Sequence, residues 1–161
     1  MGYTIMNDLS ARALQKEEMK LSLGPAKGKD FLTTLGPYIV TKDEIDNPQN
    51  LQVNLWNNGA LRQNFNTDDM AHKIPRCISW VSSIHTLEPG DILATGTNHR
   101  GLNPFMDGDR IELEIEGLGR LTIHIKDELK RTWERVTRLE HAERGADGVH
   151  TPQLTGKYAA T

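Results

Sequence analysis

The sequence predicts a mainly β fold with small helices (α+β), arranged as a barrel or a sandwich. Two stretches predict hairpins, because apolar residues alternate with polar ones on both sides of a turn. The first turn is Asn58-Gly59, a pair that favours the left-handed conformations of a tight turn, and the second is formed by residues 117–119. The strands outnumber the helices and show no βαβ rhythm, which favours a mainly β domain.

The elements before the first hairpin follow from local composition. Residues 3–6 form an apolar run and are predicted to be a strand, whereas residues 11–19, rich in Ala, Leu, Gln, Glu and Lys, are predicted to be a short helix. Residues 23–29 contain two glycines and a proline, so they are predicted to be a loop. Residues 38–41 are rich in β-branched side chains and predict a strand, which ends before a turn at residues 46–48.

The elements between the two hairpins are a helix and a strand. Apolar residues recur at helical spacing up to Ile84, and Pro75 stands near the start, where its missing N–H costs little. This pattern predicts a helix over residues 75–84. A turn at residues 88–91 then leads into a predicted strand at residues 92–94.

The end of the chain loses periodicity after about Val136. The sequence therefore predicts a domain over residues 1–135 and a polar tail over residues 136–161. The tail is too polar to fold alone, so we expect it either to be disordered or to wrap around a partner subunit, and neither alternative is preferred.

The overall composition predicts one soluble globular domain with a core of its own. The chain has 161 residues, of which 37% are hydrophobic and 25% are charged. Its net charge of −3 argues against nucleic-acid binding, which needs a concentrated basic face. No secretory signal is recognisable and no segment approaches the roughly 18 apolar residues of a membrane span, so we expect a cytoplasmic protein without a membrane partner. Cys77 is the only cysteine, which excludes an intrachain disulfide.

Polar side chains gather where the first predicted strand meets the first predicted helix. Asp8 lies just before the helix, and Arg12 and Gln15 are three residues apart on one of its faces. A carboxylate at this point could ligate a hard divalent cation, which prefers oxygen ligands. Alternatively, Asp8 or Ser10 caps the helix, and the spacing alone favours capping.

Two loops could bind an anionic ligand. Lys27 and Lys29 flank Gly28, and either lysine could act as a point charge, although exposed lysines in glycine-rich loops are more often only solvated. Residues 96–101 follow a predicted strand, and Gly-Thr loops at strand ends often direct backbone N–H and hydroxyl groups at a ligand oxygen. Here the spacing supports a site and an ordinary turn equally. His99 is the only histidine inside such a loop, and no two histidines have metal-ligand spacing.

Taken together, these segments resemble the fumarylacetoacetate hydrolase family, in its C-terminal catalytic domain. Each motif is modest alone, but the ordered series is highly specific. It implies the mixed β-sandwich or barrel roll of that domain. The motifs, in the family's order, are Gly2-Tyr3-Thr4-Ile5-Met6-Asn7-Asp8-Leu9-Ser10-Ala11-Arg12, Gly28-Lys29-Asp30-Phe31, Leu35-Gly36-Pro37, Asn58-Gly59, residues 67–70, Pro89-Gly90-Asp91-Ile92 and Ala94-Thr95-Gly96-Thr97.

The resemblance implies an enzyme that cleaves a carbon–carbon bond next to a carbonyl in a 2-oxo or β-diketo acid. It implies Mg²⁺ (or Ca²⁺ or Mn²⁺) as the cofactor, which acts as a Lewis acid on the enolate leaving group, while cationic side chains add electrostatic stabilisation. Similar proteins decarboxylate, hydrate or isomerise such acids. The implied roles are metal ligand for Asp8, catalysis for Lys29 and Thr33, and substrate binding for Arg12, Gln15, Gly96 and Thr97.

Three departures from the family pattern affect these expectations. Ala13 stands where the family commonly has Asp, and residues 98–102 replace a loop that usually continues with proline, which should change substrate choice. The family's Glu-x-Glu metal ligands and its water-activating histidine precede the segment that begins at Gly2. We therefore expect a homodimer that takes a small oxo-acid substrate, with a separate N-terminal chain supplying the remaining ligands. The alternative is a truncated or split non-catalytic subunit with a binding or structural role.

Overall fold

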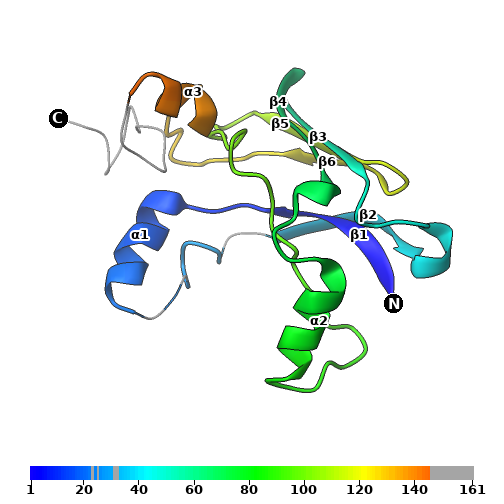
Figure 1. Cartoon of the computed structure of the whole chain (residues 1–161). Coiled ribbons are helices and arrows are strands. Elements are labelled where there is room, and N and C mark those ends of the chain that lie inside the picture. Colours follow the sequence, from blue (N-terminus) through cyan, green and yellow to red (C-terminus); the bar gives the residue numbers. More distant parts are fainter. Residues whose placement is uncertain (23, 25, 31–32, 146–161) are drawn as a thin grey trace.

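The computed structural model describes residues 1–22, 24, 26–30 and 33–145. Its strands form two antiparallel sheets, one with the order β1-β2 and one with the order β4-β3-β5-β6 (Figure 1). The strands are β1 Gly2–Asp8, β2 Thr33–Thr41, β3 Gln52–Asn57, β4 Ala60–Asn66, β5 Arg110–Ile115 and β6 Gly119–His124. The helices are α1 Arg12–Lys20, α2 Ile74–Ser82 and α3 Arg138–Glu143, with short 3-10 turns η1 Lys42–Glu44 and η2 Thr67–Asp69.

The two predicted hairpins are confirmed, and the turn of the first is fixed by the start of β5. Asn58 and Gly59 have φ angles of +50° and +81°, the left-handed values that a two-residue hairpin turn needs. The Asn58 side chain donates from Nδ2 to Asp109 Oδ1 over 2.8 Å and accepts at Oδ1 from the Arg110 backbone N–H over 2.9 Å. β5 then pairs with β3 on one side and with β6, across the second hairpin, on the other.

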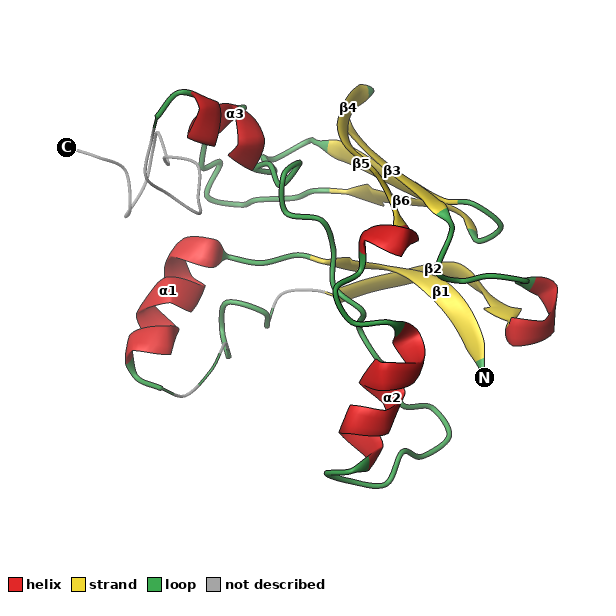
Figure 2. Ribbon diagram, in the orientation of Figure 1, coloured by secondary structure: helices red, strands yellow, loops and turns green. Residues whose placement is uncertain are grey.

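The core lies between the β1–β2 ribbon and the four-stranded sheet. Val53 and Leu55 from β3 and Leu113 from β5 are buried, because alternate residues of each strand face the ribbon. Ile5 of β1 and Ile111 of β5 are completely buried. β1 contacts β5 and β2 contacts β6, so the ribbon crosses the sheet and closes a partial roll (Figure 2). The predicted mainly β fold with small helices is confirmed.

The two predicted helices also form. The helix expected over residues 11–19 is α1, and the helix expected over residues 75–84 is α2, with Pro75 in its first turn. α2 has no buried residue and projects away from both sheets (Figure 1), so the side chains of Trp80 and Ile84 remain exposed.

Two predictions differ from the structure. The strand predicted at residues 92–94 is not formed, because none of the described strands pairs with this segment and a strand exists only through its hydrogen-bonded neighbour. The predicted polar tail begins with an ordered helix, α3, whose start is fixed by a capping box between Thr137 and Glu140. The rest of the tail, residues 146–161, lies outside the described residues.

Within the described ranges, none of the helices combines the length and the apolar composition needed to cross a bilayer.

Candidate functional site

Lys29 reaches the end of β1 from the loop that follows α1. Its Nζ lies 2.6 Å from Asp8 Oδ2 and 2.6 Å from Ser10 Oγ. The Asp8 side chain is 48% exposed and the Lys29 side chain 27%, so both remain accessible to a ligand. The capping interpretation of Asp8 and Ser10 is wrong, since the N-cap residue of α1 is Ala11 and the helix has no side-chain cap hydrogen bond.

The loop that carries Lys29 is fixed to α1 by the Glu18 carboxylate. Glu18 Oε1 accepts hydrogen bonds from the backbone N–H groups of Lys27 over 2.5 Å and Gly28 over 3.2 Å. The Gly28 carbonyl in turn accepts from the Ala11 N–H over 2.9 Å. A Cβ at position 28 would lie 2.9 Å from Glu18 Oε2 and 3.2 Å from Gln15 Cα, so glycine allows the loop to pack closely against α1. The local sequence thereby places Lys29 beside Asp8.

Two of the predicted site residues lie next to this pair. Thr33 is the direct partner of Asp8 in the β1–β2 ladder, and residues opposite each other in an antiparallel pair present their side chains on the same face. Gln15 lies on α1 against Gly28, one turn away from Arg12. Their assigned roles stay predictions.

Arg12 begins α1 and is partly buried beside Asp8. Burial lowers the pKa of the Arg12 guanidinium, repulsion by Arg138 lowers it further, and attraction by Asp8 acts in the opposite direction. Two cationic side chains from distant parts of the sequence therefore interact near the end of β1.

The Gly96-Thr97 loop faces the same region. Gly96 has a φ angle of +84°, which glycine adopts without strain. Thr97 Oγ1 lies 3.5 Å from Gln63 Nε2, and the same amide donates to the Asn98 carbonyl over 2.7 Å. Asn98 Nδ2 donates to Asp69 Oδ2 over 2.7 Å. The buried Gln63 of β4 and Asp69 of η2 thus hold the loop in place.

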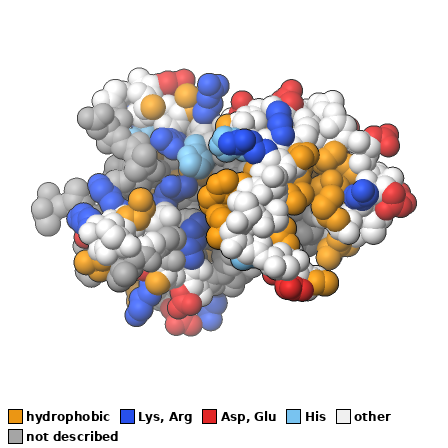
Figure 3. Space-filling view, turned by 60° about the horizontal axis from the view of Figure 1, so that its bottom comes forward, with side chains coloured by type: hydrophobic (Ala, Val, Ile, Leu, Met, Phe, Trp, Pro, Cys, Tyr) orange, Lys and Arg blue, Asp and Glu red, His pale blue; other side chains and the backbone are white. Residues whose placement is uncertain are grey.

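An open cleft of about 2560 Å³ brings most of the predicted site residues together. Gln15 and Thr33 do not line it, although Thr34 does. Figure 3 shows histidine side chains beside lysine and arginine side chains near the centre of one face of the molecule. The predicted residues that line the cleft are Asp8, Arg12, Lys29, Gly96 and Thr97.

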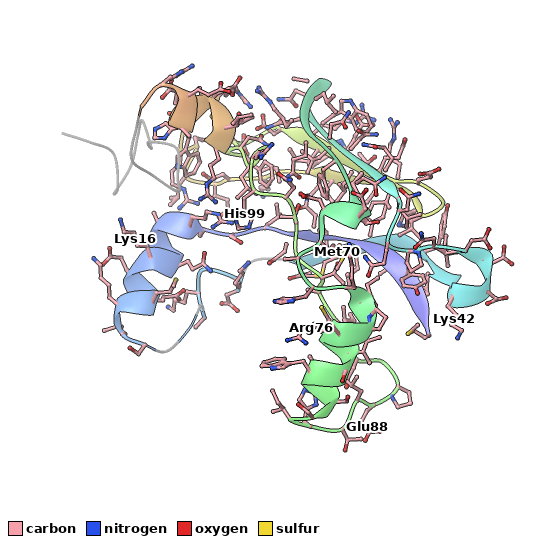
Figure 4. All side chains as sticks on the ribbon, in the orientation of Figure 1. Lys16, Lys42, Met70, Arg76, Glu88 and His99 are labelled. Atoms are coloured by element: carbon pink, nitrogen blue, oxygen red, sulfur yellow. The ribbon has the colours of Figure 1, made fainter. Side chains whose placement is uncertain are left out.

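The sequence did not indicate one residue of this cleft, Arg138. Arg138 Nη1 lies 3.0 Å from His99 Nδ1, and both side chains line the cleft. In Figure 4, His99 lies beside the segment that joins β1 to α1. The Thr137 and Glu140 spacing of a capping box is the signal that predicts a helix here, and a helix start would have drawn attention to Arg138.

The described residues supply one candidate metal ligand and do not complete a metal centre. The Asp8 carboxylate has the hard oxygen donors that Mg²⁺ or Mn²⁺ prefers. However, among the residues that the structure describes, no group of three or more His, Cys, Asp or Glu side chains is placed to hold a metal ion. Further ligands would have to come from another segment or subunit.

Comparison with known proteins places these features in one family. The family model "Fumarylacetoacetate (FAA) hydrolase C-terminal" matches residues 1–126. The 4-hydroxyphenylacetate degradation bifunctional isomerase/decarboxylase of Salmonella dublin is 42% identical over 124 residues, which cover 77% of this chain and 28% of the relative. Maleylpyruvate hydrolase of Aquipseudomonas alcaligenes is 39% identical over 125 residues, which cover 78% of this chain and 41% of the relative.

A solved structure is also similar to this chain. Fumarylpyruvate hydrolase from Pseudomonas aeruginosa, in complex with Mn²⁺ and pyruvate, has a TM-score of 0.70 and 26% identity, over 79% of this chain and 55% of that one. The chain spans about half the length, or less, of the curated relatives it matches. The match to the family model includes Asp8, Lys29 and Thr97, whereas Arg138 lies beyond it. The chain therefore belongs to the fumarylacetoacetate hydrolase family, through the C-terminal domain of that family.

Proposed function

We propose that the cleft binds a 2-oxo or β-diketo acid and that the protein cleaves the carbon–carbon bond next to a carbonyl of this acid. The observation that carries the proposal is the Asp8–Lys29 pair, which lines the same cleft as Arg12 and Thr97. A carboxylate and three groups able to donate hydrogen bonds suit a ligand with several oxygens and negative charge. Family membership and the similarity to a maleylpyruvate hydrolase and a fumarylpyruvate hydrolase support the same conclusion.

The reaction that suits this cleft is hydrolysis of an acylpyruvate. Water adds to the acyl carbonyl carbon, and the bond from that carbon to the neighbouring methylene carbon breaks. The electron pair passes into the pyruvate part as an enolate, which then takes up a proton, so the products are a carboxylic acid and pyruvate. The Lys29 ammonium stabilises the negative charge of the enolate, while Arg12 and the Thr97 hydroxyl hold the substrate oxygens.

We propose that Asp8 is one ligand of a divalent cation. A bound Mg²⁺ or Mn²⁺ supplies Lewis-acid stabilisation of enolate charge. The solved relative described above contains Mn²⁺, which supports this choice of cofactor. Because the described residues offer no group of three ligands, the proposal includes a second segment, on a separate N-terminal chain or elsewhere, that contributes further carboxylates.

We also propose a homodimer in the cytoplasm. Trp80 on α2 and Ile84, two residues beyond its end, are both exposed, and they support an interface because exposed apolar patches mark association surfaces. Sedimentation of the purified protein measures the mass, and a monomer at all concentrations would contradict this assignment.

The experiment that tests the proposed function is proton NMR of reaction mixtures containing the protein, Mg²⁺ and a panel of acylpyruvates and oxaloacetate. One spectrum follows pyruvate release, decarboxylation and keto–enol exchange together. We expect conversion of at least one oxo acid above the rate without protein. If every acid remains unchanged with Mg²⁺ and with Mn²⁺, both for the protein alone and after addition of a chain that supplies the Glu-x-Glu ligands, the proposed function fails and the non-catalytic subunit becomes the better description.

A further inference from the structure

Two arginine side chains and one histidine side chain, from three separate segments, line one end of the cleft. Arg12 comes from the start of α1, His99 from the loop after the Gly96-Thr97 turn, and Arg138 from the start of α3. His141, one turn further along α3, also lines the cleft. α1 and α3 lie on the same side of the molecule, at the end where β1 stops (Figure 1).

The position of Arg138 relative to His99 is fixed by the backbone. The Arg138 N–H donates to the Leu102 carbonyl over 2.8 Å, and the Leu139 N–H donates to the Arg100 carbonyl over 2.8 Å. These two bonds attach the first turn of α3 to the loop that carries His99. The backbone of Arg138 is therefore held beside the loop that carries His99, so the side chain starts close to the cleft.

The carboxylates near this cluster are bonded to other groups, although the Asp8 charge still attracts Arg12. Asp8 is paired with Lys29 at 2.6 Å, Asp69 accepts from Asn98, and Glu140 accepts from the Thr137 N–H over 2.5 Å. Among the described residues, neither Arg12 nor Arg138 forms an ion pair with a carboxylate. Burial lowers the pKa of Arg12 most, and repulsion by Arg138 lowers it further, so the positive potential of the two guanidiniums overlaps here.

The contact between Arg138 and His99 also determines which nitrogen of the imidazole carries the proton. A guanidinium has only donors, so His99 Nδ1 accepts from Arg138 and the proton of the neutral ring resides on Nε2. The Nε2–H is then a further donor of the cluster. The Arg138 guanidinium keeps N–H groups that do not bond to His99, and such a planar fork of donors matches the two oxygens of a carboxylate.

We propose that His99 and Arg138, with the positive potential of Arg12, form a second anion subsite that binds the distal carboxylate of a dicarboxylic 2-oxo acid. The inference rests on the proposed function, because it assigns the other end of the same substrate to the Asp8–Lys29 side of the cleft. Arg138 lies outside residues 1–126, the part of the chain that the family model matches.

The test compares two ligands that differ only in the distal group. 2-Oxoglutarate carries a carboxylate where 2-oxopentanoate carries a methyl group. Calorimetry with the protein and Mg²⁺ measures the affinity for each. We expect 2-oxoglutarate to bind about tenfold more tightly than 2-oxopentanoate, the effect of one charged hydrogen-bonded pair.

Arg138→Gln should remove this preference and leave the affinity for 2-oxopentanoate unchanged. His99→Gln should reduce the preference, and it provides a second variant. Arg100→Gln is the matched control, because Arg100 is an exposed arginine in the same loop and does not line the cleft, and we expect it to keep the tenfold preference.

The outcomes separate the two proposals. Equal affinity of the unaltered protein for both acids, or a preference that persists in Arg138→Gln, overturns the subsite and leaves the oxo-acid function intact. If neither acid binds, the proposed function fails and the subsite fails with it.

Discussion

Lys29 Nζ lies 2.6 Å from Asp8 Oδ2, so the loop after α1 places a cation against the carboxylate that ends β1. Both side chains are partly exposed, and an ion pair of this kind contributes only about 0–1 kcal/mol to folding. The pair is therefore a weak source of stability. We propose that it serves ligand binding instead, because it lines the cleft with Arg12 and Thr97.

Lys29→Met tests that role. We expect turnover of oxo acids to fall by at least about 100-fold, because the charge that stabilises the enolate is lost. The melting temperature should change by only a few degrees, in line with the small stability of an exposed pair. Thermal unfolding and the NMR assay measure the two effects, and a collapsed melting temperature would contradict the assignment.

Asp109 is a buried carboxylate whose hydrogen bonds stabilise the fold. Its side chain is only 3% exposed and accepts two hydrogen bonds from Arg135, over 2.7 and 3.0 Å. Asp109→Asn should lower the free energy of unfolding by about 2–3 kcal/mol, since charged hydrogen bonds to a buried group are lost. Urea unfolding measures the change. Asp46→Asn, at an exposed position, should stay within about 0.5 kcal/mol of the unaltered protein.

The contribution of Asp109 should depend on pH. Burial by itself raises the pKa of this carboxyl, but hydrogen bonds from Arg135, Asn58 and the Met106 N–H outweigh it, and the pKa in the folded protein is lowered. The stabilisation is therefore complete above the unfolded-state value of about 3.9 and is lost as the pH falls through the lower folded-state value. The stability difference between the protein and Asp109→Asn should shrink in acid, and a constant difference from pH 7 to pH 3 would contradict this mechanism.

Gly101 lies where the loop after Thr97 crosses β4. A Cβ at this position would overlap the Arg62 carbonyl oxygen and approach Gln63 Cγ, and the backbone cannot move aside as a flexible side chain can. Gly101→Ala should destabilise the protein by about 1–3 kcal/mol through overpacking. An unchanged urea midpoint would show that the loop is not held against β4.

The pKa of His99 depends on the charges around it. Its pKa is lowered by partial burial first, and then by repulsion from Arg12 and Arg138. Arg138→Gln should raise the pKa of His99 towards its ordinary value of about 6.5, because one repelling cation is removed. A pH titration of the imidazole Hε1 resonance measures the shift. Arg100→Gln should leave the pKa unchanged, and the prediction fails if Arg138→Gln does so too.

The hairpins could be predicted from sequence because their signals are local. Asn58-Gly59 encodes its own turn, and the alternation in β5 and β6 encodes which face is buried. Whether residues 92–94 form a strand could not be decided from the local sequence, since a strand depends on a partner that is often distant in the sequence. The same limit applies to Arg138, whose place in the cleft depends on backbone bonds to residues 100 and 102.

The candidate site, too, could be predicted only in part from the sequence. The Asp8, Lys29 and Thr97 motifs were recognisable as an ordered series, and the structure brings all three to one cleft. The hydrogen bonds that hold them, from Lys29 to Ser10 and from Gln63 to Asn98, connect residues 19 and 35 positions apart and leave no periodic pattern in the sequence. Spacing alone favoured a helix cap at Asp8, but the helix begins one residue after Ala11 without a side-chain cap, and Asp8 pairs with Lys29 instead.

The most direct test of the central claim is calorimetric titration of Mn²⁺ into the protein and its Asp8→Asn variant, with pyruvate present and with a chain added that supplies the Glu-x-Glu ligands, because the described residues do not complete a metal centre. Asp30→Asn is the matched control, because Asp30 is an exposed carboxylate in the loop that carries Lys29. We expect Mn²⁺ to bind the unaltered protein and Asp30→Asn equally, and to lose at least about tenfold in affinity with Asp8→Asn. Equal Mn²⁺ affinity in all three proteins, or no Mn²⁺ binding by any of them, would contradict the account.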